Sequence, residues 1–124
     1  MTGDTATAIN FKDLFASIDA MDTERFLSFI HEDGTFRFGS SPPVTGREGI
    51  RAAVESFFAT FAALRHEVGQ LIAQDNAVAC EGTVTYTRHD GSTITLPFAN
   101  MFGVEDGLIS TYHVYIDIGP LYAA

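Results

Sequence analysis

A carboxylate, an amide and a phenol, from Glu81, Asn100 and Tyr112, are predicted to lie side by side on an apolar sheet face. Polar groups on such a face are costly to bury without partners, so they either satisfy one another or bind a ligand. Burial disfavours the charged form of a carboxyl, so Glu81 would be able to act as a base near neutral pH. Asn100 and Tyr112 would then stabilise a developing oxyanion. The alternative is structural: Glu81 points outward, or bonds to Asn100 and only holds the sheet together.

A second acid–base pair is conceivable from His113 and Asp117 on the last strand. At about 3.3 Å per residue the two side chains would be about 13 Å apart, which is too far for a hydrogen bond. The predicted register places both on the outer face of the sheet. A register error of one residue would turn them inward, and the site would then be built around His113, Tyr115 and Asp117.

The other histidines carry no clear chemistry by their spacing. His31 lies at a helix end beside two acids, where it suits the helix dipole, while His66 and His89 are interpreted as strand-end and turn residues. None of the four histidines has a metal-ligand spacing such as His-Glu-x-x-His, and no dinucleotide or phosphate-loop motif is present. The sequence therefore predicts neither a metal nor a cofactor.

The side chains discussed above depend on helices that the sequence predicts in the first half of the chain. Apolar residues fall at i, i+3, i+4 and i+7 from Phe11, with Asn10 as the N-cap. Asp22 can cap a short second helix, and residues 45–48 form a capping-box pattern that opens a third. Residues 35–38 alternate like a short strand between the second and third helices.

The second half of the chain predicts a meander of strands. Apolar and polar residues alternate there, and turn sequences separate the segments. Helices followed by such a meander indicate an α+β domain with the helices packed on one sheet face. The four long strands are predicted over residues 65–74, 77–88, 92–104 and 108–118.

Hairpin loops decide which side chains meet. Asp90-Gly91 is interpreted as a two-residue loop, which sets Glu81 opposite Asn100. For the last hairpin, a two-residue loop at residues 106–107 and a three-residue loop at residues 105–107 are both conceivable. The three-residue loop matches apolar with apolar residues and sets Asn100 opposite Tyr112, so it is preferred.

The two predicted sheet faces have different roles. The outer face would expose Val84, Tyr86, Pro97, Met101 and Tyr115, which is more apolar surface than a small acidic monomer should leave uncovered, so a homodimer through this face is expected. The inner face and the helices are expected to enclose a ligand pocket for a small apolar molecule. Its expected lining is Phe15, Phe38, Phe58, Thr83, Leu96, Phe98 and Val114.

Composition limits the class of protein. The chain has 124 residues, 11 of them Phe, and a formal net charge of -9, so binding to nucleic acid or to an anionic membrane surface is not expected. The single Cys80 excludes an internal disulfide and fits a reducing compartment. Residues 1–8 lack the features of a signal peptide and are predicted to be a flexible tail before a single domain over residues 9–124. A cytoplasmic location is expected.

Four motifs in this order of elements resemble the nuclear transport factor 2-like superfamily, in its SnoaL-like and ketosteroid-isomerase-like branch. The motifs are Asp22 in the helix–helix turn, His-Glu-Asp at residues 31–33, Thr-Gly-Arg-Glu-Gly-Ile at residues 45–50, and the last hairpin at residues 102–109. The resemblance implies a cone, in which a curved, mostly antiparallel sheet wraps around N-terminal helices with a pocket at the open end. Members are often dimers. They include isomerases, polyketide cyclases, epoxide hydrolases, dehydratases and binding domains.

The catalytic groups of these relatives do not all carry over. The isomerases' helix Tyr and general-base Asp correspond to Leu14 and Phe38, and their oxyanion-hole Asp corresponds to Asn100. The epoxide hydrolases' Arg and two Asp correspond to Glu81, Thr83 and Val114, and the cyclases' Asp also falls near Val114.

Each of these mechanisms therefore lacks an essential group. The resemblance leaves two hypotheses: a cofactor-free isomerase, cyclase or dehydratase that moves protons on a small apolar substrate, or a non-catalytic ligand-binding or scaffold domain. A cavity of about 300 Å³ or more with a polar floor would favour the enzyme.

Overall fold

The computed structural model describes residues 9–123. The predicted tail over residues 1–8 lies outside the described residues, and the division of the chain into that tail and one domain stays a prediction. In chain order the elements are α1 (Phe11–Asp19), α2 (Thr23–Leu27), β1 (Ile30–Phe38), β2 (Val44–Thr45), α3 (Arg47–Phe58), β3 (Ala63–Gln74), β4 (Ala77–Thr87), β5 (Thr93–Glu105), β6 (Leu108–Tyr115) and α4 (Gly119–Tyr122).

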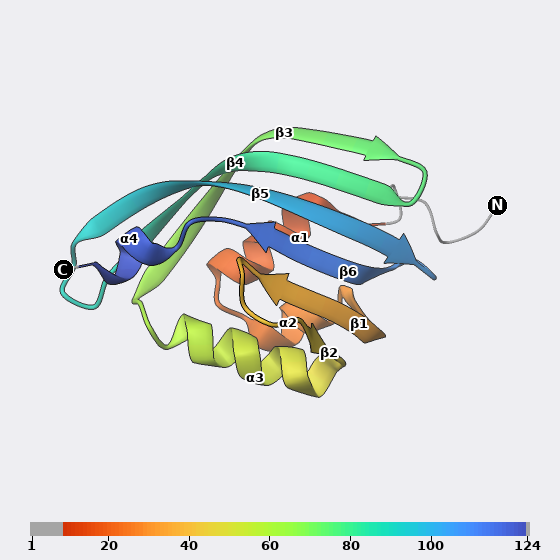
Figure 1. Ribbon diagram of the computed structural model, residues 1–124, viewed down its shortest axis with the longest axis horizontal. Helices are drawn as coiled ribbons and strands as arrows, with labels where there is room; N and C mark the ends of the chain where they lie inside the picture. The colour runs from red at the N-terminus through yellow and green to blue at the C-terminus, as the bar shows by residue number, and fades with distance from the viewer. Residues whose placement is uncertain (1–8, 124) are drawn as a thin grey trace.

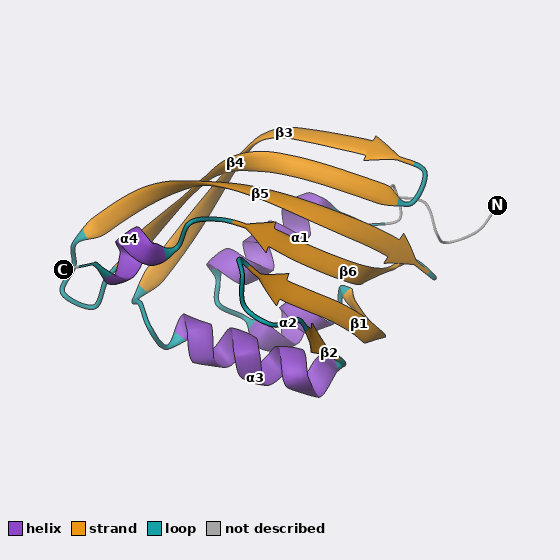
Figure 2. Ribbon diagram, viewed as in Figure 1, coloured by secondary structure: helices purple, strands orange, loops and turns teal. Residues whose placement is uncertain are grey.

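Six strands form one curved, unclosed sheet in the order β2-β1-β6-β5-β4-β3. The β1–β6 pair is parallel and the other pairs are antiparallel. Helices α1, α2 and α3 all lie on one side of the sheet, which arches over them (Figure 1, Figure 2). The predicted α+β class, with a curved, mostly antiparallel sheet around N-terminal helices, is confirmed.

Two helix starts form as predicted and one does not. Asn10 accepts a hydrogen bond from the backbone N of Asp13, and Asp22 accepts one from that of Arg25. Helix α3, however, has Gly46 as its N-cap, without a side-chain hydrogen bond. Thr45 belongs to β2, where its hydroxyl lies 3.2 Å from that of Thr35, so it pairs across strands instead of capping the helix.

The β4–β5 hairpin differs from the prediction by one residue. The backbone N of Arg88 donates to the O of Ser92, which leaves a three-residue loop that contains Gly91 at φ +89°. The Asp90 carboxylate stabilises this loop by accepting hydrogen bonds from both the backbone N and the hydroxyl of Ser92. Asn100 therefore pairs with Cys80 and not with Glu81. A one-residue shift exchanges the faces of a strand, so β4 presents the opposite set of side chains to that predicted.

The β5–β6 hairpin does not have the predicted three-residue loop, but its strands present the predicted side chains to the inner face of the sheet. Glu105 pairs with Leu108 across a two-residue loop, whose residues Asp106 and Gly107 both have positive φ. An irregularity between Gly103 and Val104 then shifts the register by one residue. The shift restores the predicted alternation, so that Asn100, Tyr112 and Val114 all lie on the inner face, with Asn100 opposite Val114 and Tyr112 opposite Phe102.

The hydrophobic core lies between the inner sheet face and the three N-terminal helices. Aromatic rings fill much of it; Phe11 packs on Phe102 with ring centroids 4.9 Å apart, and Phe102 on Tyr112 at 4.5 Å. Arg47 ties the start of α3 to β1 through two hydrogen bonds to the Ile30 carbonyl, at 2.8 and 2.6 Å. Within residues 9–123, no helix has both the length and the apolar character needed to cross a membrane.

Candidate functional site

The structure separates the three predicted catalytic residues. Asn100 and Tyr112 are buried on the inner face, whereas Glu81 is exposed on the outer face. The expectation that Glu81 lies inside the cone is wrong, because the longer β4–β5 loop turns this side chain outward. Cys80 takes the inner position beside Asn100.

A histidine and an aspartate that the sequence did not connect form a pair at this face. Asp19 is the last residue of α1, and His66 lies on the edge strand β3. One carboxylate oxygen of Asp19, Oδ1, lies 2.6 Å from Nδ1 of His66, and the other, Oδ2, accepts the backbone N–H of His66 at 3.0 Å. Both side chains are largely buried, with 11% of His66 and 25% of Asp19 exposed. The second hydrogen bond fixes the position of the carboxylate relative to the ring.

This geometry determines the protonation of the neutral imidazole. A carboxylate only accepts hydrogen bonds, so Nδ1 of His66 carries the proton and donates it to Asp19. Nε2 is then left with a free lone pair and can accept a proton. The ring is held between Phe15 and Phe98, at centroid distances of 5.0 and 5.2 Å. His66 is therefore an oriented base with apolar neighbours.

His66 also lines an internal cavity of about 50 Å³. The remaining polar groups of its lining are Tyr86, Asn100 and Tyr112. The cavity is large enough for a few water molecules as it stands. Four of the predicted ligand-binding residues also line it: Phe38, Phe58, Phe98 and Val114.

The other predicted lining residues lie elsewhere. Phe15 lines a separate groove between α1 and β3. Leu96 is buried on the inner face opposite Val84. Thr83 is exposed on the outer face for the same reason as Glu81, so its predicted place in the pocket is wrong.

Burial changes the chemistry of the polar groups around the cavity. Oδ1 of Asn100 is buried without a hydrogen-bond partner among the described residues, which leaves an acceptor for a ligand or a water. Burial raises the pKa of Tyr112 well above its usual value, so its hydroxyl stays protonated and can donate. Burial also raises the pKa of the Cys80 thiol to about 11, which makes it a poor nucleophile.

The second predicted acid–base pair does not form. His113 is on the outer face, where its ring stacks on Tyr115 at 3.9 Å and its Nε2 lies 3.3 Å from the Gly39 carbonyl. Asp117 follows the end of β6, is exposed, and accepts the backbone N–H of Gly119. Neither residue lines the cavity.

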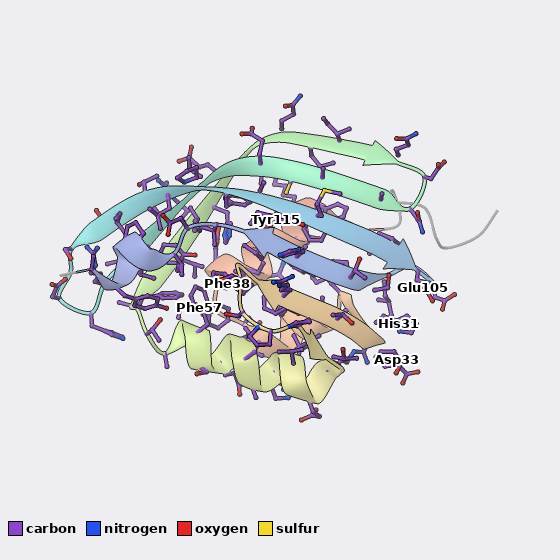
Figure 3. All side chains as sticks on the ribbon, in the orientation of Figure 1. His31, Asp33, Phe38, Phe57, Glu105 and Tyr115 are labelled. Carbon is purple, nitrogen blue, oxygen red and sulfur yellow. The ribbon has the colours of Figure 1, made fainter. Side chains whose placement is uncertain are left out.

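A cluster of His31, Glu105 and Asp106 at one end of the sheet has the residue types of a metal site; Figure 3 labels His31 and Glu105 there, beside Asp33. One ligand atom from each lies within 4.8 Å of the others. Nδ1 of His31, however, accepts the backbone N–H of Asp33 at 3.1 Å. Nε2 then carries the proton of the neutral ring and points toward Asp106 at 3.4 Å. A protonated nitrogen cannot bind a metal, so the cluster does not suit one.

The outer face is less apolar than predicted. Val84 and Tyr86 are buried inside, because β4 has the opposite orientation to that expected. Met101 and Tyr115 are exposed to 45% and 51%, and Ile72 on β3 to 58%. Together with Pro97, which is exposed on this face as predicted, these three side chains form its exposed apolar surface.

Comparisons with known proteins agree with this architecture. The model of the SnoaL-like domain matches residues 11–112. No curated protein matches the sequence. Among solved structures, TerC, co-crystallised with polyporic acid, is 22% identical, with a TM-score of 0.80 over 90% of this chain and 92% of its own.

Two further structures have the same fold. A putative SnoaL-like polyketide cyclase from Jannaschia sp. CCS1 is 16% identical, with a TM-score of 0.82 over 98% of this chain and 92% of that one. A protein of ketosteroid isomerase-like fold from Catenulispora acidiphila DSM 44928, in complex with trimethylamine, is 15% identical, with a TM-score of 0.78 over 90% and 85%. The family match covers most of the chain, and with the fold it confirms the resemblance: the chain belongs to the SnoaL-like domain family, within the nuclear transport factor 2-like fold.

Proposed function

We propose that this protein is a cofactor-independent acid–base catalyst for a small apolar carbonyl compound, with His66 as the base. The observation that carries the proposal is the pair of hydrogen bonds that the Asp19 carboxylate accepts from the ring and from the backbone of His66. They fix both the orientation of the imidazole and its tautomer, which are the requirements for a general base. Isomerisation, cyclisation and dehydration all begin with such a proton transfer.

Asn100 and Tyr112 supply the other half of the chemistry. Loss of a proton from the carbon beside a carbonyl places negative charge on the carbonyl oxygen. The Tyr112 hydroxyl, kept protonated by burial, is a donor suited to that oxygen. Asn100 has an amide in the same lining and an unpartnered oxygen that could accept a hydroxyl of the substrate.

The volume of the cavity supports a second candidate, a non-catalytic ligand-binding or scaffold domain. About 50 Å³ is well below the roughly 300 Å³ expected of a small-molecule pocket. Phe38 and Phe57, whose rings are 4.7 Å apart, separate the cavity from a hollow of about 280 Å³ against α3; Figure 3 labels both rings between β1 and α3. Catalysis therefore requires the two rings to move so that the cavity and the hollow become one space. In a scaffold domain the rings would stay in place and the two spaces would remain separate.

Hydrogen–deuterium exchange distinguishes the two candidates without knowledge of the natural product. Cyclic ketones such as 1-indanone are incubated with the protein in D₂O, and NMR follows deuterium entering the carbon beside the carbonyl. Nε2 of His66 would remove that proton, the imidazolium would exchange it for deuterium from D₂O, and Nε2 would then return a deuteron to the carbon. We expect catalysed exchange that falls at least ~10²-fold in His66→Gln.

The matched control is His31→Gln, which removes an imidazole outside the cavity. Exchange in this variant should equal that of the wild type. No catalysed exchange with any ketone in the panel would favour the scaffold. Exchange that is unchanged in His66→Gln would contradict the proposed base.

We also propose a homodimer through the outer sheet face. Ile72, Met101 and Tyr115 are exposed large apolar side chains on that face. Burial of apolar surface is the main driving force for association. Light scattering at micromolar concentration should give twice the chain mass, and Ile72→Glu combined with Met101→Glu should give the monomer mass. A monomer mass for the wild type would refute the dimer.

A further inference from the structure

A groove of about 420 Å³ runs between helix α1 and the edge strand β3 and is also lined by His66. His66 lines both this groove and the internal cavity. The groove exists because α1 does not fully cover the inner face of β3. Val68 and Leu71 stay 40% and 42% exposed there, although they lie on the same sheet face as the core. The volume is that of a small-molecule pocket.

One side of the groove is a stripe along α1. Lys12, Phe15, Ala16 and Asp19 follow one another at i, i+3, i+4 and i+7, so they share one face of the helix. Ala16 is the smallest side chain in the stripe and leaves space where a larger residue would fill the groove. Lys12 at one end is the only lysine of the chain, and Asp19 at the other end is already bonded to His66.

The positive charge at one end of this stripe and the negative charge at the other determine which charge a ligand can carry and where. The protein has a formal net charge of -9, and Lys12 is the cation in the lining. An anionic group on a ligand would be attracted by Lys12 and repelled by Asp19. The two residues are seven positions apart on the helix, which is about 10 Å along the axis. An apolar body of that length, carrying its charge at one end, would therefore reach from Lys12 to His66.

We propose that the groove between α1 and β3 binds a small apolar carboxylate, with the carboxylate at Lys12 and the apolar body directed toward His66. Phe15, Val68 and Leu71 supply the apolar contact. The inference does not depend on the proposed function, because Asn100 and Tyr112 line the cavity and not this groove.

Two probes that differ in charge test the proposal by isothermal titration calorimetry: biphenyl-4-carboxylate and the neutral biphenyl-4-carboxamide. Lys12→Gln should weaken the carboxylate about three- to fivefold, as expected for a partly exposed ion pair, and Lys12→Glu about tenfold or more. Binding of the carboxamide should change less than twofold in both variants. The matched charge control is Arg25→Gln, which removes an exposed cation of α2 that does not line the groove.

A second pair of variants tests the location. Ala16→Phe should fill the groove and weaken both probes at least tenfold, whereas Ala52→Phe, at an exposed position of α3, should change neither. An equal effect of Lys12→Gln on both probes, binding unaffected by Ala16→Phe, or no binding of the carboxylate would each overturn the proposal. Calorimetry requires no turnover, so the binding result stays separate from the result of the ketone-exchange assay.

Discussion

Two histidine–aspartate pairs in this protein have the same residue types and opposite chemistry. In the first, Nδ1 of His66 donates to Asp19, which leaves Nε2 as the base in a ring that lines the cavity. In the second, Nδ1 of His31 accepts a backbone N–H, so that Nε2 carries the proton toward Asp106, whose side chain is 75% exposed. In the first pair the backbone N–H of His66 donates to the carboxylate, which is held beside Nδ1. In the second pair the backbone N–H of Asp33 donates to Nδ1 of the ring itself. These contacts decide which ring nitrogen carries the proton in each pair.

Burial reinforces the difference. The first pair is wedged against Phe15 and Phe98, where the ring has few ways to reorient. The second pair joins the start of β1 to the β5–β6 turn at the surface, where water can replace its hydrogen bond. We infer that the first pair contributes to catalysis and to stability, and that the second contributes little to either.

The largest expected effect is on catalysis by Asp19→Asn. The Asp19 carboxylate accepts two hydrogen bonds, and an asparagine amide has only one oxygen to accept with. The NH₂ group of the amide would face either the backbone N–H of His66 or its Nδ1–H, and both of these are also donors. When it faces the ring, it favours the tautomer with the proton on Nε2, because Nδ1 can then accept. Ketone exchange should fall at least ~10²-fold. Asp106→Asn is the control and should leave the rate unchanged; equal rates in the two variants would show that the tautomer has no role.

The next effect is on stability in the same two variants. Asp19→Asn leaves one buried donor of His66 without an acceptor, so the free energy of unfolding should fall by about 1–3 kcal/mol. Asp106→Asn should change it by less than about 0.5 kcal/mol, because asparagine suits the positive φ of 54° at this turn. Urea denaturation measures both. A larger loss in Asp106→Asn would reverse the comparison.

A third prediction extends the contrast between buried and exposed groups to pH. The pKa of Cys80 is raised by burial from 9.0 to about 11, so the folded state binds its proton more tightly than the unfolded state. The neutral thiol therefore stabilises the fold fully below about pH 9, and this contribution is lost as the pH rises toward 11. The free energy of unfolding should fall more steeply over that range in the wild type than in Cys80→Ala, by on the order of 2 kcal/mol. Parallel curves would contradict the burial of the thiol.

The smallest effect is expected next to Cys80, at Glu81. This side chain lies on the exposed outer face. Glu81→Gln should change the free energy of unfolding by less than about 0.5 kcal/mol and leave ketone exchange intact. Loss of exchange in this variant would restore Glu81 as the base and would mean that the β4–β5 register differs from the one described here.

The sequence predicted the fold well, because its signals are local. Asn10 and Asp22 are side-chain caps, and strand alternation and turn residues predicted the approximate bounds of four of the six strands. The strand predicted at residues 35–38 covers only the second half of β1, and β2 was not predicted. Register was the weak step. Asp90-Gly91 fits a two-residue loop, but hydrogen bonds from Ser92 to Asp90 stabilise a loop one residue longer, and that residue moved Glu81 out of the site.

The site itself was partly predictable. Asn100 and Tyr112 were placed on the inner face, because the shift between Gly103 and Val104 compensated for the wrong loop length. The Asp19–His66 pair was missed, since the two residues are 47 positions apart and only the packing of α1 on β3 brings them together. The one available signal was the alternation of Leu64, His66 and Val68, which places His66 on the face that packs against the helices.

The most direct test of the central claim reads the two tautomers. A long-range ¹H–¹⁵N correlation spectrum of the imidazole rings, recorded at about pH 8.5 where an ordinary histidine is neutral, distinguishes a protonated from an unprotonated ring nitrogen. His66 should show an unprotonated Nε2 and His31 an unprotonated Nδ1, assigned by the loss of each signal in His66→Gln and His31→Gln. The same tautomer in both rings, or a protonated Nε2 in His66, would contradict the assignment of His66 as the base.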